Sequence, residues 1–351
     1  MPHFFNEDIQ QIITTDKINW KQFAGSFILV TGATGLVGGS LVRVLSSANK
    51  YHNLSMCVIA HGRDTAKGNL LKNECGVMFI EGDIRNPLFF ADITERIDYI
   101  FHCAAITKSA DMVVRPVDVM STAVDGTRNI LEYAKKFHCK SLVNLSSMEV
   151  YGQISTSEEV TENDLGYLDL SNPRTSYPES KRFCESMCVA YYKQYNIQVK
   201  IARLAMTFGA GTPNDETNTR APMQFARKAL AGENIVLHTQ GDSVTNCCYT
   251  ADAVLGLLIL LLNGKNGEAY NIANPAATVT IREMANIVAQ VIGNGKISVV
   301  VEIPKDAAKQ GYAPTVTTRL NTDKLKSLGW LPKYRLEDMY QRMVADWAEN
   351  E

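Results

Sequence analysis

The stretch that decides the fold is residues 31–38, which read TGATGLVG and follow the apolar run SFILVT of residues 26–31. A short β-rich run, a glycine turn and a helix that starts near Leu36 make a strand–turn–helix unit. Glycines in such a turn let the backbone approach a diphosphate, and the helix N-terminus then stabilises the negative charge. We therefore predict that this turn binds a dinucleotide. The contacting residues would be Gly32, Thr34, Gly35, Leu36, Val37 and Gly38.

Beyond the turn, short β-rich runs alternate with helical stretches. The predicted strands are residues 26–31, 56–60, 77–80, 99–103, 141–145 and 198–203. Helical stretches such as 36–47 and 121–137 lie between them. This alternation predicts a doubly wound α/β fold, in which helices cover both faces of a parallel sheet. The last third of the chain predicts helices at 222–231, 251–263 and 281–292, mixed with short strands.

Three regions follow from this order. Residues 1–25 form a helical extension, because Ile9, Ile12 and Ile13 recur at helical spacing. Residues 26–205 form the dinucleotide-binding domain. Residues 206–351 form a smaller mixed α/β lobe, mainly substrate-binding and interleaved with the first domain.

Composition excludes several classes of protein. The 351 residues carry 35 Lys+Arg against 37 Asp+Glu, a net charge of −2, which argues against nucleic-acid binding and a polybasic membrane anchor. The longest apolar run, 253–262, is too short to span a bilayer, and the N-terminus shows no secretory signal. The eight cysteines show neither CxxC pairs nor zinc-like spacing with histidines. We expect a cytoplasmic protein with reduced thiols and no metal site.

The end of the second predicted strand bears on the choice of dinucleotide. An acidic residue there would accept hydrogen bonds from the adenosine ribose, but this chain has Gly62 and Arg63. Gly62 leaves room and Arg63 offers a positive fork for a 2′-phosphate, which favours NADP. Asp64 lies just beyond and could still reach the ribose, so NAD remains open. After the third strand, Asp83 and Ile84 suit an adenine contact, with Asp83 accepting from the exocyclic amine.

The sharpest local signal is Tyr177 followed four residues later by Lys181, with Pro178 in a first helical turn. A nearby ammonium and a cationic nicotinamide would favour the phenolate of a tyrosine, whose usual pKa is about 10. The phenolate can exchange a proton with a substrate hydroxyl while hydride moves to the nicotinamide. Ser147 lies directly after the fifth strand, at the carboxyl end of the sheet, and could hydrogen-bond the same oxygen.

These motifs together resemble the extended short-chain dehydrogenases/reductases of the NAD(P)-dependent nucleotide-sugar epimerase/dehydratase family. The resemblance covers roughly residues 25–345. It rests on TGxxGxxG at 31–38, HxAA at 102–105, SSxxVYG at 146–152 and YxxxK at 177–181. It implies a Rossmann-type sheet and a homodimer. It also implies that Ser147, Tyr177 and Lys181 form the catalytic triad, that Tyr177 and Lys181 contact the cofactor, and that Ala104 and Ala105 line the dinucleotide.

The family resemblance implies transient oxidation of a sugar hydroxyl at C4, followed by epimerisation, dehydration or decarboxylation of a nucleotide sugar. Glu149 resembles a carboxylate of the family's 4,6-dehydratases and uronic-acid decarboxylases, where it could act as a second base. Met148 stands where some dehydratases carry an acid. One alternative is an NADPH-dependent reductase of a sugar or small carbonyl. A non-enzymatic dinucleotide-binding scaffold is another, which the intact Tyr177 and Lys181 argue against.

The chain departs from the family pattern where the substrate would bind. Several members carry an arginine for the sugar-nucleotide diphosphate in the segment that here is 242–249, which has none. Ala123 stands where an asparagine is common. Lys108, which follows the fourth strand, and Arg174, just before Tyr177, are candidate substrate contacts, as is Arg203. Ser147 completes the predicted substrate-binding set.

Overall fold

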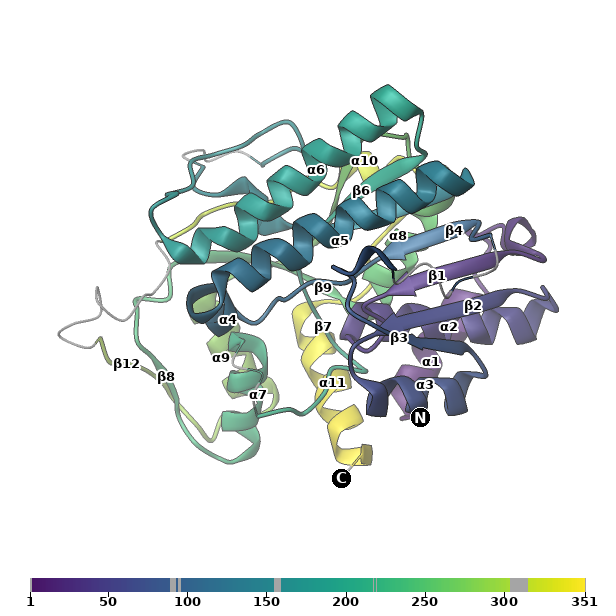
Figure 1. The fold of residues 1–351 in the computed structure, drawn as a ribbon. Coiled ribbons are helices and arrows are strands. Elements are labelled where there is room, and N and C mark those ends of the chain that lie inside the picture. Colours follow the sequence, from purple (N-terminus) through teal and green to yellow (C-terminus); the bar gives the residue numbers. More distant parts are fainter. Residues whose placement is uncertain are drawn as a thin grey trace.

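A computed structural model describes residues 2–88, 93, 96–154, 159–216, 218, 220–303 and 315–350. Its centre is a seven-stranded sheet with the order β10-β6-β5-β4-β1-β2-β3, in which every neighbouring pair is parallel (Figure 1). The strands of this sheet are β1 (Phe27–Thr31), β2 (Cys57–Gly62), β3 (Met78–Glu81), β4 (Tyr99–His102), β5 (Ser141–Ser147), β6 (Val199–Leu204) and β10 (Ala269–Ile272). The strand order reverses between β1 and β4, and parallel sheets bind ligands beyond the carboxyl ends of the strands at such a point.

The remaining strands belong to the second half of the chain. One small sheet has the order β11-β9-β7 and another pairs β12 with β8. These strands are β7 (Met206–Phe208), β8 (Ile235–Leu237), β9 (Val244–Tyr249), β11 (Asn274–Thr280) and β12 (Val299–Val301). In Figure 1, β8 and β12 lie with α7 and α9 at the lower left, away from β1–β3.

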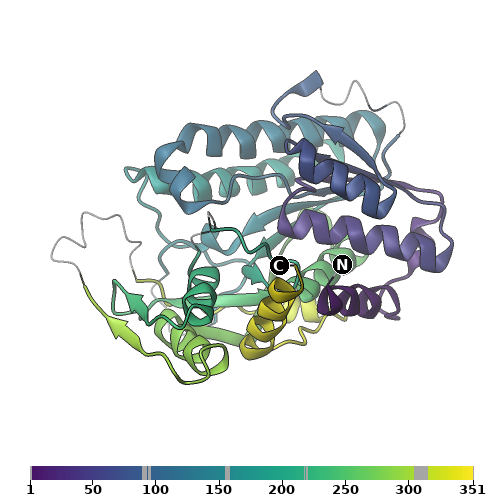
Figure 2. The same cartoon turned by 90° about the horizontal axis from the view of Figure 1, so that it is seen from below.

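Helices cover both faces of the central sheet. The α-helices are α1 (His3–Ile13), α2 (Leu36–His52), α3 (Thr65–Cys75), α4 (Ser109–Val114), α5 (Pro116–Phe137), α6 (Ser176–Tyr195), α7 (Ala221–Leu230), α8 (Thr250–Asn263), α9 (Ile281–Val291), α10 (Asp323–Lys326) and α11 (Leu336–Asn350). The short 3₁₀ helices are η1 (Trp20–Phe23), η3 (Met148–Tyr151) and η4 (Pro173–Thr175). Helices α5 and α6 pack side by side on one face, and α2 and α8 pack on the other (Figures 1 and 2).

The two-faced burial explains the apolar sequence of the strands. In β1, Ile28 and Val30 belong to the core on the α2 and α8 side, whereas Leu29 belongs to the core beneath α5 and α6. The same alternation recurs in β2, where Val58 faces one core and Ile59 the other. Because successive side chains point to opposite faces, a strand covered on both sides must be apolar throughout.

The N-terminal helix α1 packs against α2 and α11, which brings the two ends of the chain together (Figure 2). Its buried face includes the three isoleucines of the predicted extension. Asp8, 3% exposed, accepts hydrogen bonds from the Tyr249 hydroxyl at 2.5 Å and from the Arg342 guanidinium at 2.6 Å. A buried carboxylate therefore joins α1 to β9 and α11.

The predicted strands and helices agree with the structure in their order, but some ends differ and one strand was not predicted. Helix α2 continues to His52, beyond the predicted end at residue 47. Helix α5 begins at Pro116 rather than at 121, because proline fits a first helical turn. The sheet also contains β10, a seventh strand that joins the far edge from within the region assigned to the second lobe. In the part of the chain that the structure describes, no helix is long and apolar enough to cross a bilayer.

Candidate active site

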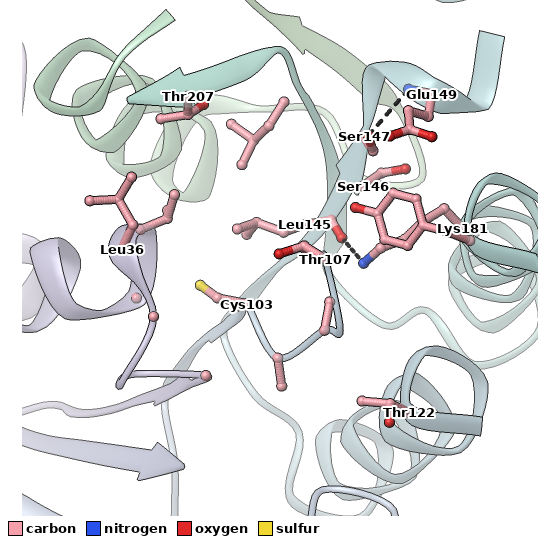
Figure 3. Close-up of a pocket in the computed structure, with 18 of the residues that line it drawn as sticks. Leu36, Cys103, Thr107, Thr122, Leu145, Ser146, Ser147, Glu149, Lys181 and Thr207 are labelled. Carbon is pink, nitrogen blue, oxygen red and sulfur yellow. Dashed lines mark hydrogen bonds between the residues drawn. The ribbon is translucent and has the colours of Figure 1, made fainter. Parts of the chain in front are cut away.

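A cavity of about 610 Å³ lies at the carboxyl ends of β1, β4 and β5, where the strand order reverses (Figure 3). Its lining combines the glycine turn, the end of β2, the segments after β3 and β4, and the end of β5 with η3. Helix α6 contributes Tyr177 and Lys181, and the second half of the chain contributes residues 204–207 and 220–221. All the predicted cofactor-binding and catalytic residues line this cavity.

The glycine turn is packed so tightly that side chains are excluded. Gly32 has φ +65°, and a Cβ there would lie 2.8 Å from the backbone of Ala104. A Cβ on Gly38 would lie 2.4 Å from the Gly32 carbonyl oxygen, and one on Gly62 would lie 2.9 Å from the Thr34 side chain. Gly35 caps α2 without a side-chain hydrogen bond, so the first amides of that helix stay available to an anion. The turn therefore fits a dinucleotide diphosphate.

The adenosine end of the cavity contains Arg63, Asp64, Asp83 and Ile84. The Asp64 carboxylate caps α3 by accepting a hydrogen bond from the Lys67 amide at 3.0 Å. The Asp83 carboxylate pairs with Arg85 at 2.7 Å, and this hydrogen bonding lowers the pKa of Asp83. Both carboxylates are thus engaged, whereas Arg63 lies at the wall of the cavity.

The candidate catalytic end brings Ser147 from β5 together with Tyr177 and Lys181 from α6. Figure 3 shows Ser147 and Lys181. Burial, with a smaller contribution from the nearby Glu149 carboxylate, raises the pKa of Tyr177 to about 12, although a hydrogen bond with Ser147 acts to lower it. The Lys181 ammonium lies 6.0 Å from the Tyr177 ring centroid and donates to the Leu145 carbonyl at 2.7 Å. Burial lowers the pKa of Lys181. The phenol is therefore protonated at neutral pH in this structure.

A second group of charges faces Tyr177. Arg174 in η4 binds the Glu149 carboxylate at 2.9 and 3.4 Å, so the candidate second base is held as an ion pair. Arg220, just before α7, also lines the cavity and donates to the Thr107 carbonyl at 3.2 Å. Both guanidinium groups lower the pKa of Tyr177. Met148 lines the cavity next to Glu149, and its thioether side chain cannot act as a second acid there.

Two predicted substrate contacts lie elsewhere. Arg203 is 5% exposed, does not line the cavity, and binds the Glu185 carboxylate with its shortest hydrogen bond at 2.7 Å. The prediction that Arg203 binds substrate is therefore corrected: a buried carboxylate engages its guanidinium. Lys108 lies just before α4, between Thr107 and Ser109. Both of these neighbours line the cavity, but Lys108 does not.

The structure also shows lining residues that the sequence did not single out as site residues. Arg220 lines the cavity, and its positive charge lowers the pKa of Tyr177. Thr207 on β7 and Thr122 on α5 line the cavity as well. None of these belongs to a motif whose spacing would have identified it.

The fold and the cavity define a dinucleotide-binding α/β enzyme with a tyrosine and a lysine at the reacting end. Residues 28–273 match the NAD dependent epimerase/dehydratase family, and the chain belongs to that family. It is 30% identical over 325 residues to UDP-glucuronic acid decarboxylase 6 of Arabidopsis thaliana, covering 91% of this chain and 88% of that protein.

Solved structures show the same fold. A dTDP-glucose 4,6-dehydratase from Streptomyces venezuelae, solved with NAD bound, superposes with a TM-score of 0.76 at 25% identity, over 92% of this chain and 97% of that one. The UDP-glucose 4-epimerase of Thermotoga maritima, solved with UDP-glucose, gives a TM-score of 0.79 at 22% identity, over 92% and 99%. The chain is thus an enzyme of the epimerase/dehydratase family, whose members use a nicotinamide dinucleotide.

Proposed function

We propose that this protein binds a nucleotide sugar, oxidises its C4 hydroxyl transiently, transforms the keto sugar and reduces it again. The observation that carries the proposal is the cavity in which the glycine turn and the Ser147, Tyr177 and Lys181 side chains meet. Its relatives support the substrate class, because they include UDP-glucuronic acid decarboxylases and a dTDP-glucose 4,6-dehydratase.

In this mechanism Tyr177 takes the proton of the C4 hydroxyl and later gives it back. Ser147 holds the same oxygen, and Lys181 orients the nicotinamide ribose. When bound, the dinucleotide would supply the acceptor and donor of the C4 hydride and a positive charge beside the phenol. That charge acts with Arg174 and Arg220 against the burial that raises the pKa of Tyr177 to about 12.

Among the family's reactions, the site favours decarboxylation of a uronic acid. Dehydration requires a base at C5 and an acid for the departing hydroxyl, but Glu149 stands beside Met148 rather than a second acid. A uronic acid oxidised at C4 is a β-keto acid. Its C5–C6 bond breaks, CO₂ leaves, and C5 keeps the electron pair as an enolate that takes up a proton. Arg220, whose guanidinium donates to the neutral Thr107 carbonyl, offers the positive charge that a substrate carboxylate needs, whereas the charge of Arg174 is paired with Glu149.

The cofactor proposal is NADP in preference to NAD. Its support is the glycine at position 62, the position of Arg63 at the cavity wall, and the engagement of Asp64 as a helix cap. The Asp64 carboxylate is in this way committed in part to the Lys67 amide. The test is to denature the purified protein and identify the released dinucleotide by mass spectrometry. Recovery of NAD⁺ alone would contradict the preference.

We propose that residues 206–351 mainly bind the sugar nucleotide and that the enzyme is a homodimer. Support for the dimer is an apolar surface on α4, α5 and α6. Its members are Val113, Val114, Val117, Met120 and Phe183, each 43–77% exposed. A second copy of the chain would cover that surface. The cytoplasm is the proposed compartment, since all eight cysteines are free.

The test of the reaction uses UDP-glucuronic acid, UDP-glucose and dTDP-glucose separately, with NAD⁺ or NADP⁺, and mass spectrometry of the products. A uronic acid decarboxylase converts UDP-glucuronic acid to a product lighter by CO₂ and leaves the other two unchanged. Loss of water from dTDP-glucose would show that the enzyme is a dehydratase and would contradict the proposed decarboxylation. Stoichiometric consumption of added NADPH by a keto sugar would favour the reductase instead.

A further inference from the structure

The candidate catalytic residues come from elements that are held in different ways. Ser147 is the last residue of β5, and it pairs with Leu204 of β6 in the parallel ladder of the sheet. Glu149 lies two residues later in η3, a single 3₁₀ turn that follows the end of the strand. Such a short turn has poor hydrogen-bond geometry of its own. The position of the Glu149 carboxylate relative to Tyr177 therefore depends on contacts from outside η3.

Arg182, the residue after Lys181 on α6, makes such contacts with the backbone. Its Nε donates to the Val150 carbonyl at 2.7 Å, and its Nη2 donates to the Gly166 carbonyl at 2.7 Å. The same Nη2 donates to the Tyr151 carbonyl at 3.5 Å. Hydrogen bonds from a charged donor are stronger than those between neutral groups. One guanidinium on α6 thus holds both η3 and the segment at Gly166.

The exit from η3 packs closely against that segment. Gly152 has φ +64°, and a Cβ there would lie 2.4 Å from the Tyr167 carbonyl oxygen. Gln153 and Tyr167 form an antiparallel bridge, with N–O distances of 2.9 and 3.1 Å. Because η3 and residues 166–167 contact each other so closely, the Arg182 guanidinium joins them to α6 as one unit.

Arg182 differs from the arginine that binds the Glu149 side chain. Arg174 donates to the Glu149 carboxylate itself and lines the cavity. Arg182 is not among the described residues that line the cavity, and its bonds to η3 go to main-chain carbonyls. At its outer edge, its Nη1 pairs with Glu179 at 3.2 Å, where the two side chains are 21% and 31% exposed. Arg182 can therefore influence the reaction only through the position of the residues that it holds.

We propose that Arg182 is a positioning residue that fixes η3 to α6 and thereby sets the Glu149 carboxylate relative to the Tyr177 hydroxyl. The inference rests on the proposed function, because the position of Glu149 matters only if its carboxylate takes part in the reaction. A displacement of about 1 Å at a reacting group can slow a reaction by about 10²-fold. Loss of the Arg182 contacts therefore lowers kcat, whereas the glycine turn and the dinucleotide site stay unchanged.

The experiment compares R182M with E179Q, with kcat expressed per folded protein as measured by circular dichroism. R182M lowers kcat about 10–100-fold and keeps the KM for the nucleotide sugar and the affinity for NAD⁺ within about threefold. E179Q is the matched control, because it removes only the outer ion pair of Arg182, and it keeps kcat within about twofold. R182K retains more kcat than R182M, since one ammonium can still donate to part of the carbonyl set. Where R182M does not fold, R182K is used for the same comparisons.

A double variant shows whether Arg182 acts through Glu149. In the E149Q background, R182M lowers kcat by less than about twofold, because the carboxylate whose position it sets is already lost. A further loss of about tenfold or more in that background would overturn the proposal. So would R182M whose kcat per folded protein stays within about twofold of the unaltered protein, since the guanidinium would then support stability alone.

A second measurement separates this inference from the proposed function. If the unaltered protein converts none of the three nucleotide sugars, the proposed function fails, and amide hydrogen exchange followed by mass spectrometry decides the role of Arg182. R182M accelerates exchange about tenfold or more in a peptide that covers residues 148–152, whereas E179Q does not. Unchanged exchange in R182M would overturn the inference, whichever substrate the enzyme uses.

Discussion

Replacing Arg203 with methionine separates a structural role from a substrate-binding role. Its guanidinium donates to both oxygens of Glu185 at 2.7–3.2 Å, to the Tyr151 hydroxyl at 3.0 Å and to the Glu162 carbonyl at 2.9 Å. The side chains of Arg203 and Glu185 are only 6% and 10% exposed. Losing one partner of a buried ion pair leaves an uncompensated charge, at a cost of about 3–5 kcal/mol.

The assay is urea unfolding followed by far-UV circular dichroism, on R203M, on E185Q and on the double variant. Each single variant loses about 3–5 kcal/mol, a large part of the roughly 5–15 kcal/mol of a typical domain. The double variant loses less than the sum, because neither charge is left alone. R335M is the control, since Arg335 is exposed and its removal changes stability by less than about 0.5 kcal/mol.

A structural role also predicts that R203M, where folded, keeps the KM for the nucleotide sugar within a few-fold. The reasoning is refuted if R203M unfolds within about 1 kcal/mol of the unaltered protein while its KM rises more than tenfold. That result would return Arg203 to the substrate contacts.

The other predictions concern the cofactor and the reacting groups. Y177F loses about 10²–10⁴ in kcat and keeps its affinity for NAD⁺, measured by steady-state kinetics and calorimetry, because only proton transfer is removed; a loss below tenfold would exclude Tyr177 as the acid/base. G38A loses dinucleotide binding, since its Cβ would lie 2.4 Å from the Gly32 carbonyl oxygen, and calorimetry that detects tight NAD⁺ binding would contradict the packing. R63A weakens NADP⁺ more than NAD⁺, and an equal effect on both would remove the 2′-phosphate contact. Burial lowers the pKa of His61 to about 4 in the folded protein, against about 6.5 in the unfolded chain. The contribution of neutral His61 to stability is therefore full above pH 6.5 and falls as the pH drops towards 4, by up to about 1.4 kcal/mol per pH unit. H61Q reduces this dependence of the unfolding free energy on pH, measured by urea unfolding at several pH values, and an unchanged dependence would contradict the assignment.

Local sequence patterns predict most of the fold because strands buried on both faces must be apolar along their whole length. The predicted strand at 99–103 agrees within one residue with β4, and the glycine turn lies where β1 meets α2. Strand β10 is different. It has only four residues, and its place depends on pairing Ala269 with Ile201, far apart in the chain. No local pattern contains that information.

The candidate site is predictable where topology gathers it and unpredictable where side-chain direction decides. Ser147 and Ala104 meet because the carboxyl ends of parallel strands share one edge of the sheet. Arg203 also lies near the carboxyl end of a parallel strand, but its side chain points to Glu185 on α6. Arg220 and Thr122 enter the cavity through the packing of α7 and α5, which residue spacing does not specify.

In the proposed reaction, the sugar is oxidised and reduced at one carbon by a cofactor that stays bound. The most direct measurement uses UDP-glucuronic acid deuterated at C4, with catalytic amounts of dinucleotide and mass spectrometry of the product. We expect the product to keep its deuterium at C4, because the hydride that leaves is the one that returns. Loss of the deuterium to solvent or to a stoichiometric pool of reduced dinucleotide would contradict it.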